Sequence, residues 1–389
     1  MFEIKTYNKI SSVGLDVFDS SKYTCSDNTN APVGAIVRSA ALHEEQFPET
    51  LLAIARAGAG TNNIPVDRCA NEGIVVFNTP GANANAVKEL VLLGLLISSR
   101  KVVPALGWAQ GLKGNGAEVG KMVEKGKSAF VGPEIAGKTL GVIGLGAIGE
   151  LVANAAIKLG MRVVGFDPFL SVKAALALSP HVEVVNDIKE IYAKSDYISL
   201  HIPYNAETKG TICADSLAFM RDGVRILNFA RGELVDTASM LAALESGKVA
   251  CYVTDFPNDE VLGVENVVAL PHLGASTPES EDNCATMAAA ELIDYIENGN
   301  IVNSVNMPAA SMPKSSDVRV CVIHDNVPAV INKITGTISA DGINIINMLN
   351  KSRGEFAYTM LDIDADKAKA DTLANDLKNI EEVIRVRVI

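Results

Sequence analysis

Short apolar runs alternate with helical patterns along the first hundred residues. The runs AIVRS (35–39) and IVVFN (74–78) have the length and composition of buried strands. A helix is expected near 49–56, and a long pattern rich in Ala and Leu predicts another over 84–99. This alternation predicts a parallel sheet covered by helices.

The same alternation restarts at Thr139 and is stronger there. Six strands are expected, with the sequences TLGVI, RVVGF, YISLHI, RILNFA, VACYVTDF and VVAL. They predict a second and larger α/β unit, again with a doubly wound parallel sheet. A helix over 278–298 follows this unit.

The last part of the chain has a different order of elements. Residues 303–316, NSVNMPAASMPKSS, lose the periodicity and gather Pro and Ser, so we expect an interdomain linker that acts as a hinge. From residue 317 onward the pattern is strand, helix, strand, strand, helix, strand. That order is typical of a small ferredoxin-like domain.

Composition narrows the class of protein. The 389 residues include 34 Lys and Arg against 46 Asp and Glu, a net charge of −12, without a basic cluster that could follow nucleic acid. The six cysteines lack the spacing of a disulfide framework or a metal site, which favours a reducing compartment. The longest apolar run, 90–97, is far shorter than the ~20 residues of a membrane span. We expect a cytoplasmic protein with neither nucleic-acid nor membrane partners.

The most specific motif is a glycine-rich turn in TLGVIGLGAIGE, residues 139–150. Gly144 permits a tight turn, Gly146 lets backbone approach a pyrophosphate, and Gly149 lets the following helix pack closely on the strand. The next strand ends at Asp167, whose carboxylate can accept hydrogen bonds from ribose hydroxyls and repels a 2′-phosphate. The motif therefore predicts NAD as cofactor.

Three later loops follow strand ends and carry groups suited to chemistry on a small acid. Arg231 in NFARGELVD can bind a carboxylate in a bidentate way. TDFPNDE (254–260) contains Asp255, Asp259 and Glu260, and LPHLGAST (270–277) contains His272. A carboxylate beside an imidazole fixes its tautomer, which suits a histidine that takes a hydroxyl proton. Taken singly, each of these residues is also compatible with an ordinary surface or structural role.

The ordered set of these motifs resembles the D-2-hydroxyacid dehydrogenase family. The resemblance extends over nearly the whole chain and includes GLGAIG, FDP, HIP, NFARGELVD, TDF, PHLGAST, RAGAGTNNIPVD (56–67), NTPGANANAVKE (78–89) and FVGPEIAGKTLGVIGLG (130–146). It implies two Rossmann-like domains. The NAD domain, 99–278, is inserted into a substrate domain of residues 1–98 and 279–302.

The resemblance also implies roles for individual residues. Arg231 orients the substrate carboxylate and His272 is the acid/base. Glu260 pairs with His272, although a longer loop follows the glutamate in relatives, so Asp259 is an alternative. Arg56 contacts a substrate phosphate. Arg38 also lies at a strand end, and either arginine could instead be an ordinary surface residue, which is the preferred interpretation for Arg38. The cofactor positions are Gly144, Gly146, Ala147, Ile148, Gly149, Asp167, Ala230 and Asp255.

Residues 317–389 resemble an ACT regulatory domain, in which neighbouring copies pair and bind an amino acid at their junction. The matching positions are His324, Asn326 and Asn344, with L-serine as the expected effector. Ala329 stands where a glycine is customary, so a purely assembling role for this unit stays open. A homo-oligomer, dimer or tetramer, is expected.

The function implied is NAD-dependent oxidation of 3-phospho-D-glycerate at C2, the first step of L-serine synthesis. One alternative is the same chemistry on another D-2-hydroxy acid, such as glycerate or lactate. A second is a binding protein that senses NAD. Arg231 and His272 argue against the sensor, because a sensor has no need of a proton acceptor.

Overall fold

The computed structural model describes all 389 residues and divides into two compact units. The first contains residues 1–83 and 278–389, and the second contains residues 84–277. The chain passes to the second unit after Asn83 rather than after residue 98, because helix α3 (Ala84–Ser99) buries Val91 and Leu95 in the second unit's core. Its bounds are those expected from the apolar pattern.

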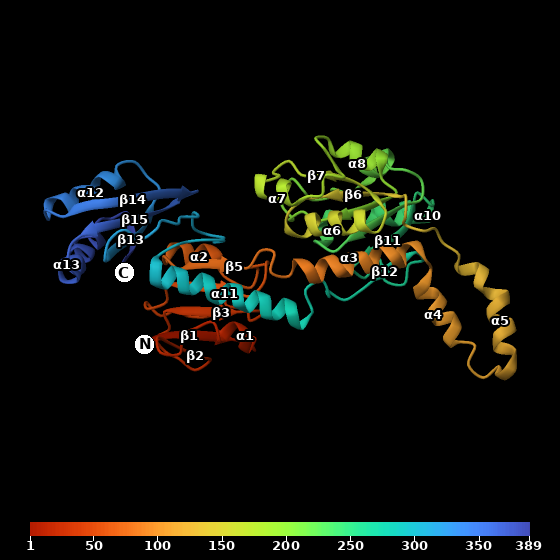
Figure 1. The fold of residues 1–389 in the computed structure, drawn as a ribbon, viewed down its shortest axis with the longest axis horizontal. Coiled ribbons are helices and arrows are strands. Elements are labelled where there is room, and N and C mark those ends of the chain that lie inside the picture. Colours follow the sequence, from red (N-terminus) through yellow and green to blue (C-terminus); the bar gives the residue numbers. More distant parts are fainter. The chain divides into compact units, whose positions relative to one another are not determined.

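The first unit contains a five-stranded parallel sheet in the order β2-β1-β3-β4-β5. Helices α1 and α11 cover one face and α2 covers the other (Figure 1). The strands are β1 (Phe2–Tyr7), β2 (Tyr23–Ser26), β3 (Gly34–Val37), β4 (Ala53–Arg56) and β5 (Val75–Asn78), and the helices are α1 (Ser12–Leu15), α2 (Val66–Asn71) and α11 (Pro278–Asn298). This strand order belongs to the doubly wound folds.

One prediction for this unit is wrong. Residues 53–56 form strand β4 instead of part of a helix near 49–56. Ala53, Ile54 and Ala55 are completely buried between layers on both faces of the sheet. A short, continuous apolar run of this kind cannot be told from a buried helix by periodicity alone. The helix expected over 278–298 is confirmed as α11.

The C-terminal part of the first unit is a four-stranded antiparallel sheet in the order β14-β15-β13-β16, the ferredoxin-like arrangement expected. Val320 and Val322 of β13 pack toward the two helices, while Cys321 and Ile323 join the core beneath α11. The elements are β13 (Val318–Asp325), α12 (Val330–Ala340), β14 (Asn344–Arg353), β15 (Phe356–Asp364), α13 (Lys367–Lys378) and β16 (Val383–Val388).

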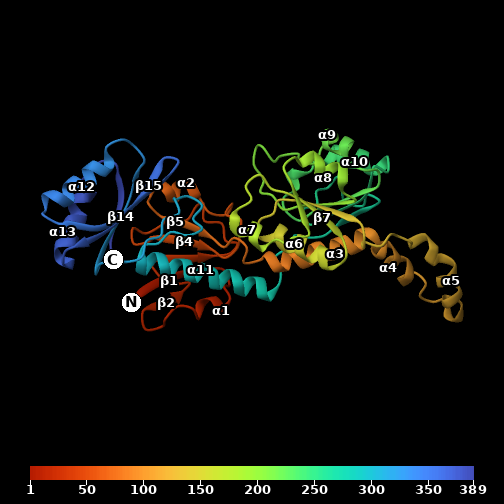
Figure 2. The ribbon, with the colours of Figure 1, turned by 45° about the horizontal axis from the view of Figure 1, so that its top comes forward.

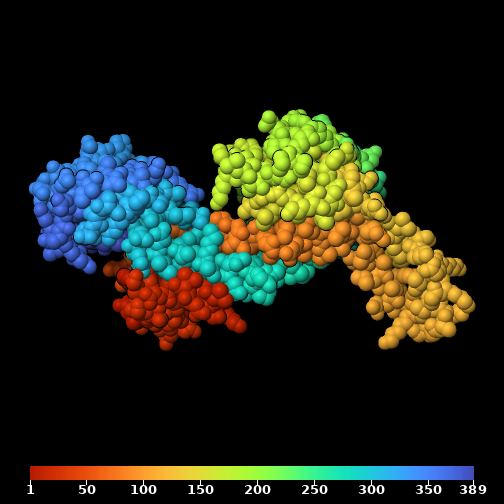
Figure 3. Space-filling model, viewed as in Figure 1, coloured from red at the N-terminus to blue at the C-terminus, as the bar shows by residue number.

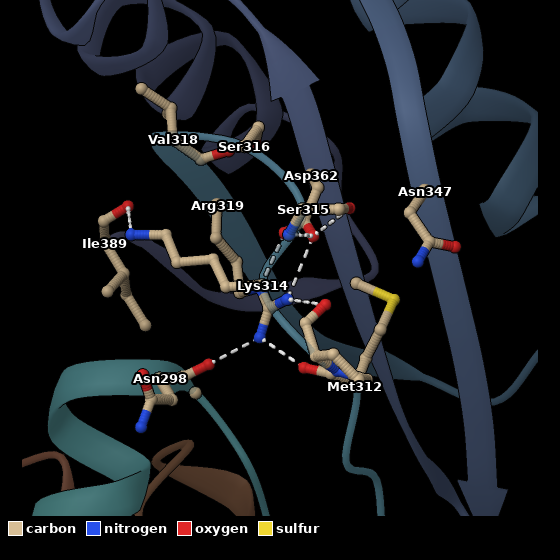
Figure 4. A network of polar contacts seen from close by, with 12 residues as sticks. Asn298, Met312, Lys314, Ser315, Ser316, Val318, Arg319, Asn347, Asp362 and Ile389 are labelled. Atoms are coloured by element: carbon tan, nitrogen blue, oxygen red, sulfur yellow. Dashed lines mark hydrogen bonds and ion pairs between the residues drawn. The ribbon is translucent and has the colours of Figure 1, made fainter.

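A buried ion pair links this sheet to the segment before it (Figure 4). Arg319 donates to both carboxylate oxygens of Asp362, at 2.6 and 3.0 Å, and neither side chain is exposed. Arg319 also donates to the carbonyls of Asn298, Met312 and Pro313. Burial alone would raise the pKa of Asp362, but the hydrogen bonds from Arg319 and Ser315 hold it below its usual value. Breaking such a pair by removing one partner costs on the order of 3–5 kcal/mol.

The segment 303–316 is not the free linker and hinge expected from its composition. Val305 donates to the carbonyl of Val76, and the Asn306 side chain bonds the backbone of Val76 and Ile74. Ile301 and Ala310 form an antiparallel bridge. Pro and Ser had suggested flexibility, but these bonds fix the segment along the edge strand β5, so it joins the two sheets of the first unit firmly.

The second unit is a seven-stranded parallel sheet in the order β12-β11-β10-β9-β6-β7-β8. Helices α3 and α6 cover one face, and α8, α9 and α10 cover the other (Figure 2). The strands are β6 (Thr139–Ile143), β7 (Arg162–Phe166), β8 (Val182–Val185), β9 (Tyr197–Leu200), β10 (Val224–Asn228), β11 (Val249–Thr254) and β12 (Val267–Ala269). The helices are α6 (Ala147–Lys158), α7 (Val172–Ala177), α8 (Ile188–Lys194), α9 (Ala214–Phe219) and α10 (Thr237–Glu245), with a 3₁₀ turn, η3 (Gly232–Leu234).

All six strands expected in the second unit are present. The seventh, β8, was not expected because two of its four positions are exposed.

Two helices, α4 (Val102–Gln110) and α5 (Val119–Gly126), extend from the second unit as an arm (Figures 1 and 3). Neither helix has a buried residue, and Trp108 packs against Phe130 within the arm. Two 3₁₀ turns, η1 (Gly116–Glu118) and η2 (Lys127–Phe130), flank α5. No single helix of the chain is long and apolar enough to cross a bilayer. The pair α3 and α4 meets that test only jointly and is bent by 70°.

Glu291 on α11 provides a test of the first unit's core. It is 8% exposed, Asn303 donates to one carboxylate oxygen, and the other oxygen has no partner. Burial raises the pKa of Glu291 to about 7. Its proton is therefore held more tightly in the folded than in the unfolded chain, so its contribution to stability falls as pH rises from about 4.5 to 7.

We expect Glu291→Gln to stabilise the protein at pH 8 by up to about 3 kcal/mol, since one pKa unit corresponds to about 1.4 kcal/mol. The gain should disappear at pH 5. Thermal unfolding of both proteins across this range measures it, with Glu279→Gln, exposed on the same helix, as the control. A pH-independent difference would show that Glu291 is not a buried titrating carboxyl group.

Candidate active site

The turn between β6 and α6 has the geometry that a dinucleotide requires. Gly144 has φ +93°, and a side chain there would lie 2.5 Å from the His201 carbonyl oxygen. A Cβ at Gly149 would lie 1.9 Å from the Gly144 oxygen, so α6 packs on the strand only because this residue is glycine. A Cβ at Gly146 would meet nothing within 4 Å. The open side of this turn therefore leaves room for a pyrophosphate.

The start of α6 adds donors to this turn. Gly146 is the N-cap, no side chain caps the helix, and the first turn contains Ala147 and Ile148. Unpaired N–H groups at such a helix start attract phosphate oxygens. At the end of β7, Asp167 accepts hydrogen bonds from the N–H groups of Leu145 (2.9 Å) and Phe169 (2.8 Å). These bonds hold the Asp167 carboxylate beside the turn, where it can receive ribose hydroxyls.

The ligand crevice of an open parallel sheet lies where the strand order reverses, here between β6 and β9. On the β9 side, β10, β11 and β12 are neighbours and end before Ala230, Asp255 and His272 respectively. Because parallel strands end at one edge, these loops gather at the same edge as the glycine turn.

The Arg231 loop is shaped by a buried side chain. Asn228 is completely buried, donates to the Arg231 carbonyl (2.8 Å) and accepts from the Ala230 N–H (3.2 Å). The Arg231 side chain is exposed, and its guanidinium bonds only the carbonyl of Ala230. Most of its donors are therefore free to bind a carboxylate.

His272 lies beside two residues of the β11 loop. Its ring is 4.5 Å from that of Phe256, centre to centre, and Arg231 lies over the same Phe256 ring at 5.8 Å. Asp255 is 1% exposed, and one oxygen accepts from the Gly274 N–H at 3.0 Å while the other has no partner. Burial raises the pKa of Asp255, and the Gly274 bond and nearby His272 only partly offset this. Asp255 thus has one buried carboxylate oxygen without a hydrogen-bond partner, and its place on the nicotinamide side stays a prediction.

The expected pairing of His272 with Glu260 is not formed. Glu260 and Asp259 are both exposed, and neither makes a hydrogen bond or an ion pair with His272. The loop after Phe256 turns toward solvent before Val261 re-enters the core, where it is 3% exposed. The structure thus brings Arg231, Asp255 and His272 together. The two candidate partners of His272, Glu260 and Asp259, lie apart from it.

His201, in the HIP segment after β9, is the other histidine at this edge. Its Nε2 lies 2.8 Å from the Ser199 hydroxyl, and burial lowers the pKa of His201 to about 3. It therefore stays neutral at working pH and is unsuited to proton transfer. No cluster of His, Cys, Asp and Glu is arranged to hold a metal.

Sequence reasoning did not single out two residues that contact the candidate site, Asn228 and Phe256. Both lie inside quoted motifs, next to residues that were chosen, but their importance comes from contacts with other loops. Such contacts are set by the neighbouring strand ends and leave no mark on the local sequence.

In the first unit, the Arg56 guanidinium occupies the space that a Gly58 side chain would take, and its Nε donates to the Arg38 carbonyl at 3.2 Å. Gly58, with φ +142°, is thus required by Arg56. Arg38 forms an ion pair with Glu281 at 2.7 Å, in the first turn of α11.

The three expected effector residues do not meet within one chain. His324 is 2% exposed, and its ring nitrogens lie within 2.9 Å of the Asp325 carbonyl and the Thr359 hydroxyl. Asn326 lies at the hairpin end of the sheet and Asn344 at the opposite end of edge strand β14. Ala329 adopts the left-handed conformation, φ +69°, that a glycine accepts without strain.

Comparisons with known proteins agree with this geometry. Residues 106–274 match the model of the "D-isomer specific 2-hydroxyacid dehydrogenase, NAD binding domain" family. The chain is 32% identical to D-3-phosphoglycerate dehydrogenase of Escherichia coli, over 88% of this chain and 82% of that protein. It is 35% identical to the enzyme of the same name from Methanocaldococcus jannaschii, over 67% of this chain and 48% of that protein.

Solved structures give the same result. An NAD-bound 3-phosphoglycerate dehydrogenase of Entamoeba histolytica superposes with a TM-score of 0.59 at 26% identity, over 78% of this chain and 98% of that one. A glyoxylate reductase from Paecilomyes thermophila superposes with a TM-score of 0.63, also at 26% identity and with the same coverage. The chain therefore belongs to the D-isomer-specific 2-hydroxyacid dehydrogenases. It is an NAD-dependent oxidoreductase.

Substitutions at Gly146 and Gly149 are expected to have opposite effects on NADH binding and on folding. We expect Gly146→Val to fold normally, because the added side chain meets open space, and to raise the Kd for NADH by about tenfold or more by blocking the pyrophosphate. Gly149→Ala should instead lower the thermal midpoint, because its Cβ collides with the Gly144 oxygen.

NADH fluorescence titration and thermal unfolding of both variants separate these effects. Normal NADH affinity in a folded Gly146→Val protein would show that the pyrophosphate does not lie against this turn.

Proposed function

We propose that this protein oxidises 3-phospho-D-glycerate at C2 to 3-phosphohydroxypyruvate, the first step of L-serine synthesis. The observation that carries the proposal is that the exposed side chains of Arg231 and His272 both contact Phe256, at the edge of the second unit's sheet where the glycine turn lies. The name of the relatives at 32% and 35% identity supports this substrate. A cytoplasmic location is part of the proposal.

The chain's own residues bind the substrate and move its proton. Arg231 holds the C1 carboxylate through two parallel hydrogen bonds, which fixes C2 and its hydroxyl relative to His272. His272 takes the hydroxyl proton as the C2–H bond breaks and returns it in the reverse reaction. Bound NAD supplies the acceptor for the hydride from C2. Arg56 of the first unit binds the phosphate.

The cofactor is held by the residues predicted from the sequence. Gly144, Gly146 and Gly149 shape the pyrophosphate turn, Ala147 and Ile148 present helix N–H groups, and Asp167 receives the ribose. The unpaired oxygen of Asp255, with the Ala230 backbone, receives the carboxamide of the nicotinamide.

We expect His272→Ala to lower kcat by about 10²-fold or more, the usual scale for losing a general acid/base, while the Kd for NADH stays unchanged. Initial rates with 3-phospho-D-glycerate and NADH titration measure the two quantities. Turnover within about threefold of the unmodified enzyme would show that another group accepts the proton.

Two matched variants test which carboxylate, Glu260 or Asp259, is the partner of His272. Glu260→Gln and Asp259→Asn remove one charge each from adjacent exposed positions. Glu260 is the proposed partner, drawn to His272 when substrate binds, so only Glu260→Gln should lower kcat strongly. A loss confined to Asp259→Asn would assign the role to Asp259.

The proposal includes a homo-oligomer. The α4–α5 arm presents apolar side chains to solvent, among them Val102 (42% exposed), Val103 (48%) and Leu106 (59%). Apolar surface gathered on an arm that packs on little of its own chain suits burial against a second copy.

The proposal also includes L-serine as an effector at the junction of two C-terminal sheets. Edge strand β14 is exposed along most of its length, including Ile346 and Met348. Two such edges in antiparallel contact bring Asn344 of one copy near Asn326 of the other, although these lie at opposite ends of a single sheet. His324 supports this site from within the sheet.

We expect L-serine at millimolar concentration to inhibit 3-phospho-D-glycerate oxidation, with a coupling of about 1 to 3 kcal/mol. Asn344→Ala should abolish the inhibition and leave the uninhibited rate unchanged, because Asn344 is exposed and remote from His272 in the chain. Inhibition that survives Asn344→Ala places serine elsewhere. If L-serine does not inhibit the unmodified enzyme, the C-terminal sheet serves only in subunit assembly.

A further inference from the structure

The side chain of Phe256 touches both residues on which the proposed reaction depends. It follows β11, which lies between β10 and β12 in the sheet. Arg231 from the β10 loop lies over its ring at 5.8 Å, and the His272 ring from the β12 loop packs against it at 4.5 Å and a tilt of 48°. No other side chain contacts both Arg231 and His272 through a ring.

The two flanking side chains have little else to hold them. The Arg231 guanidinium bonds only the carbonyl of the preceding residue, and the His272 ring makes no hydrogen bond or ion pair. Both are exposed, so each would lose its orientation without an attractive surface beside it. An aromatic face attracts a guanidinium, and a tilted ring pair is a favoured aromatic contact.

Phe256 itself is held in place from below. Its N–H donates to the hydroxyl of Thr254, which is completely buried, at 3.0 Å. The preceding residue, Asp255, bonds the Gly274 N–H and so ties the β11 loop to the His272 loop. The ring therefore projects from a backbone that is held by these bonds, and it contacts both exposed side chains.

We propose that Phe256 is a positioning residue that sets the spacing between the carboxylate anchor and the proton acceptor. This inference rests on the proposed roles of Arg231 and His272. Contact with one ring fixes the guanidinium and the imidazole relative to each other, so that a bound 2-hydroxy acid has its carboxylate at the guanidinium and its C2 hydroxyl at the imidazole. Small displacements of reacting groups are costly to the rate.

The test is Phe256→Leu, which keeps an apolar side chain but removes the ring. We expect a higher KM and a lower kcat for 3-phospho-D-glycerate, with kcat/KM falling by about tenfold or more. The primary kinetic isotope effect with substrate deuterated at C2 should rise, because misalignment slows the step that breaks the C2–H bond. The Kd for NADH should stay unchanged, and Phe256→Tyr, which restores the ring, should recover most of the activity.

Phe219→Leu is the matched control. Phe219 is a half-exposed phenylalanine of the same unit with Lys189 over its ring at 5.3 Å, and it lies outside the proposed site. It should keep the kinetic constants and isotope effect of the unmodified enzyme.

The outcomes separate this inference from the proposed function. If His272→Ala is inactive but Phe256→Leu behaves like Phe219→Leu, the positioning role is overturned and the proposed function stands. If Phe256→Leu loses NADH affinity or its thermal midpoint together with activity, the ring is a structural residue and the inference is overturned. If His272→Ala retains activity, the proposed mechanism and the positioning role fall together.

Discussion

Parallel strand direction is the constraint on which the catalytic unit depends. All seven strands of its sheet run the same way, so each delivers the residues after its last position to one edge. That edge receives the glycine turn after β6, the Arg231 loop after β10, the Asp255 and Phe256 loop after β11, and the His272 loop after β12. Four loops far apart in sequence therefore lie at one edge of the sheet.

Close backbone packing sets the position of the cofactor edge. Helix α6 starts where it does because Gly149 lies against the Gly144 oxygen, at a distance that excludes any side chain. The start of this helix has no side-chain cap, and the space beside Gly146 is open. The close contact of Gly149 with the Gly144 oxygen therefore sets where the N–H donors of the helix start lie, next to the open space at Gly146.

In the first unit, arginines of the C-terminal sheet bind the end of α11. Arg319 donates to the Asn298 carbonyl, and Arg387 donates to the carbonyls of Tyr295 and Ile296. These carbonyls lie in the last turn of the helix, where positive charge is favoured. The helix begins at Pro278, six residues after His272 in the chain.

The regular features were predictable because they rest on local pattern. Helices α3 and α11, six strands of the second sheet and the roles of Gly144, Gly146 and Gly149 follow from periodicity and glycine spacing. Strand β4 was missed because a four-residue buried run has no diagnostic period. The 303–316 segment was misjudged because its Asn306 and Ser315 bond distant backbone and carboxylate groups, which composition does not reveal. Phe256 was missed for the same reason, since its partners come from other strands.

The measurement that tests the central claim most directly is NADH formation by the unmodified protein at alkaline pH. Initial rates are compared for 3-phospho-D-glycerate, D-glycerate and D-lactate at equal concentration with saturating NAD. The roles proposed for Arg231, His272 and Arg56 predict by far the highest kcat/KM for 3-phospho-D-glycerate. Equal or higher values for D-glycerate or D-lactate, or no NADH with any of the three, would contradict it.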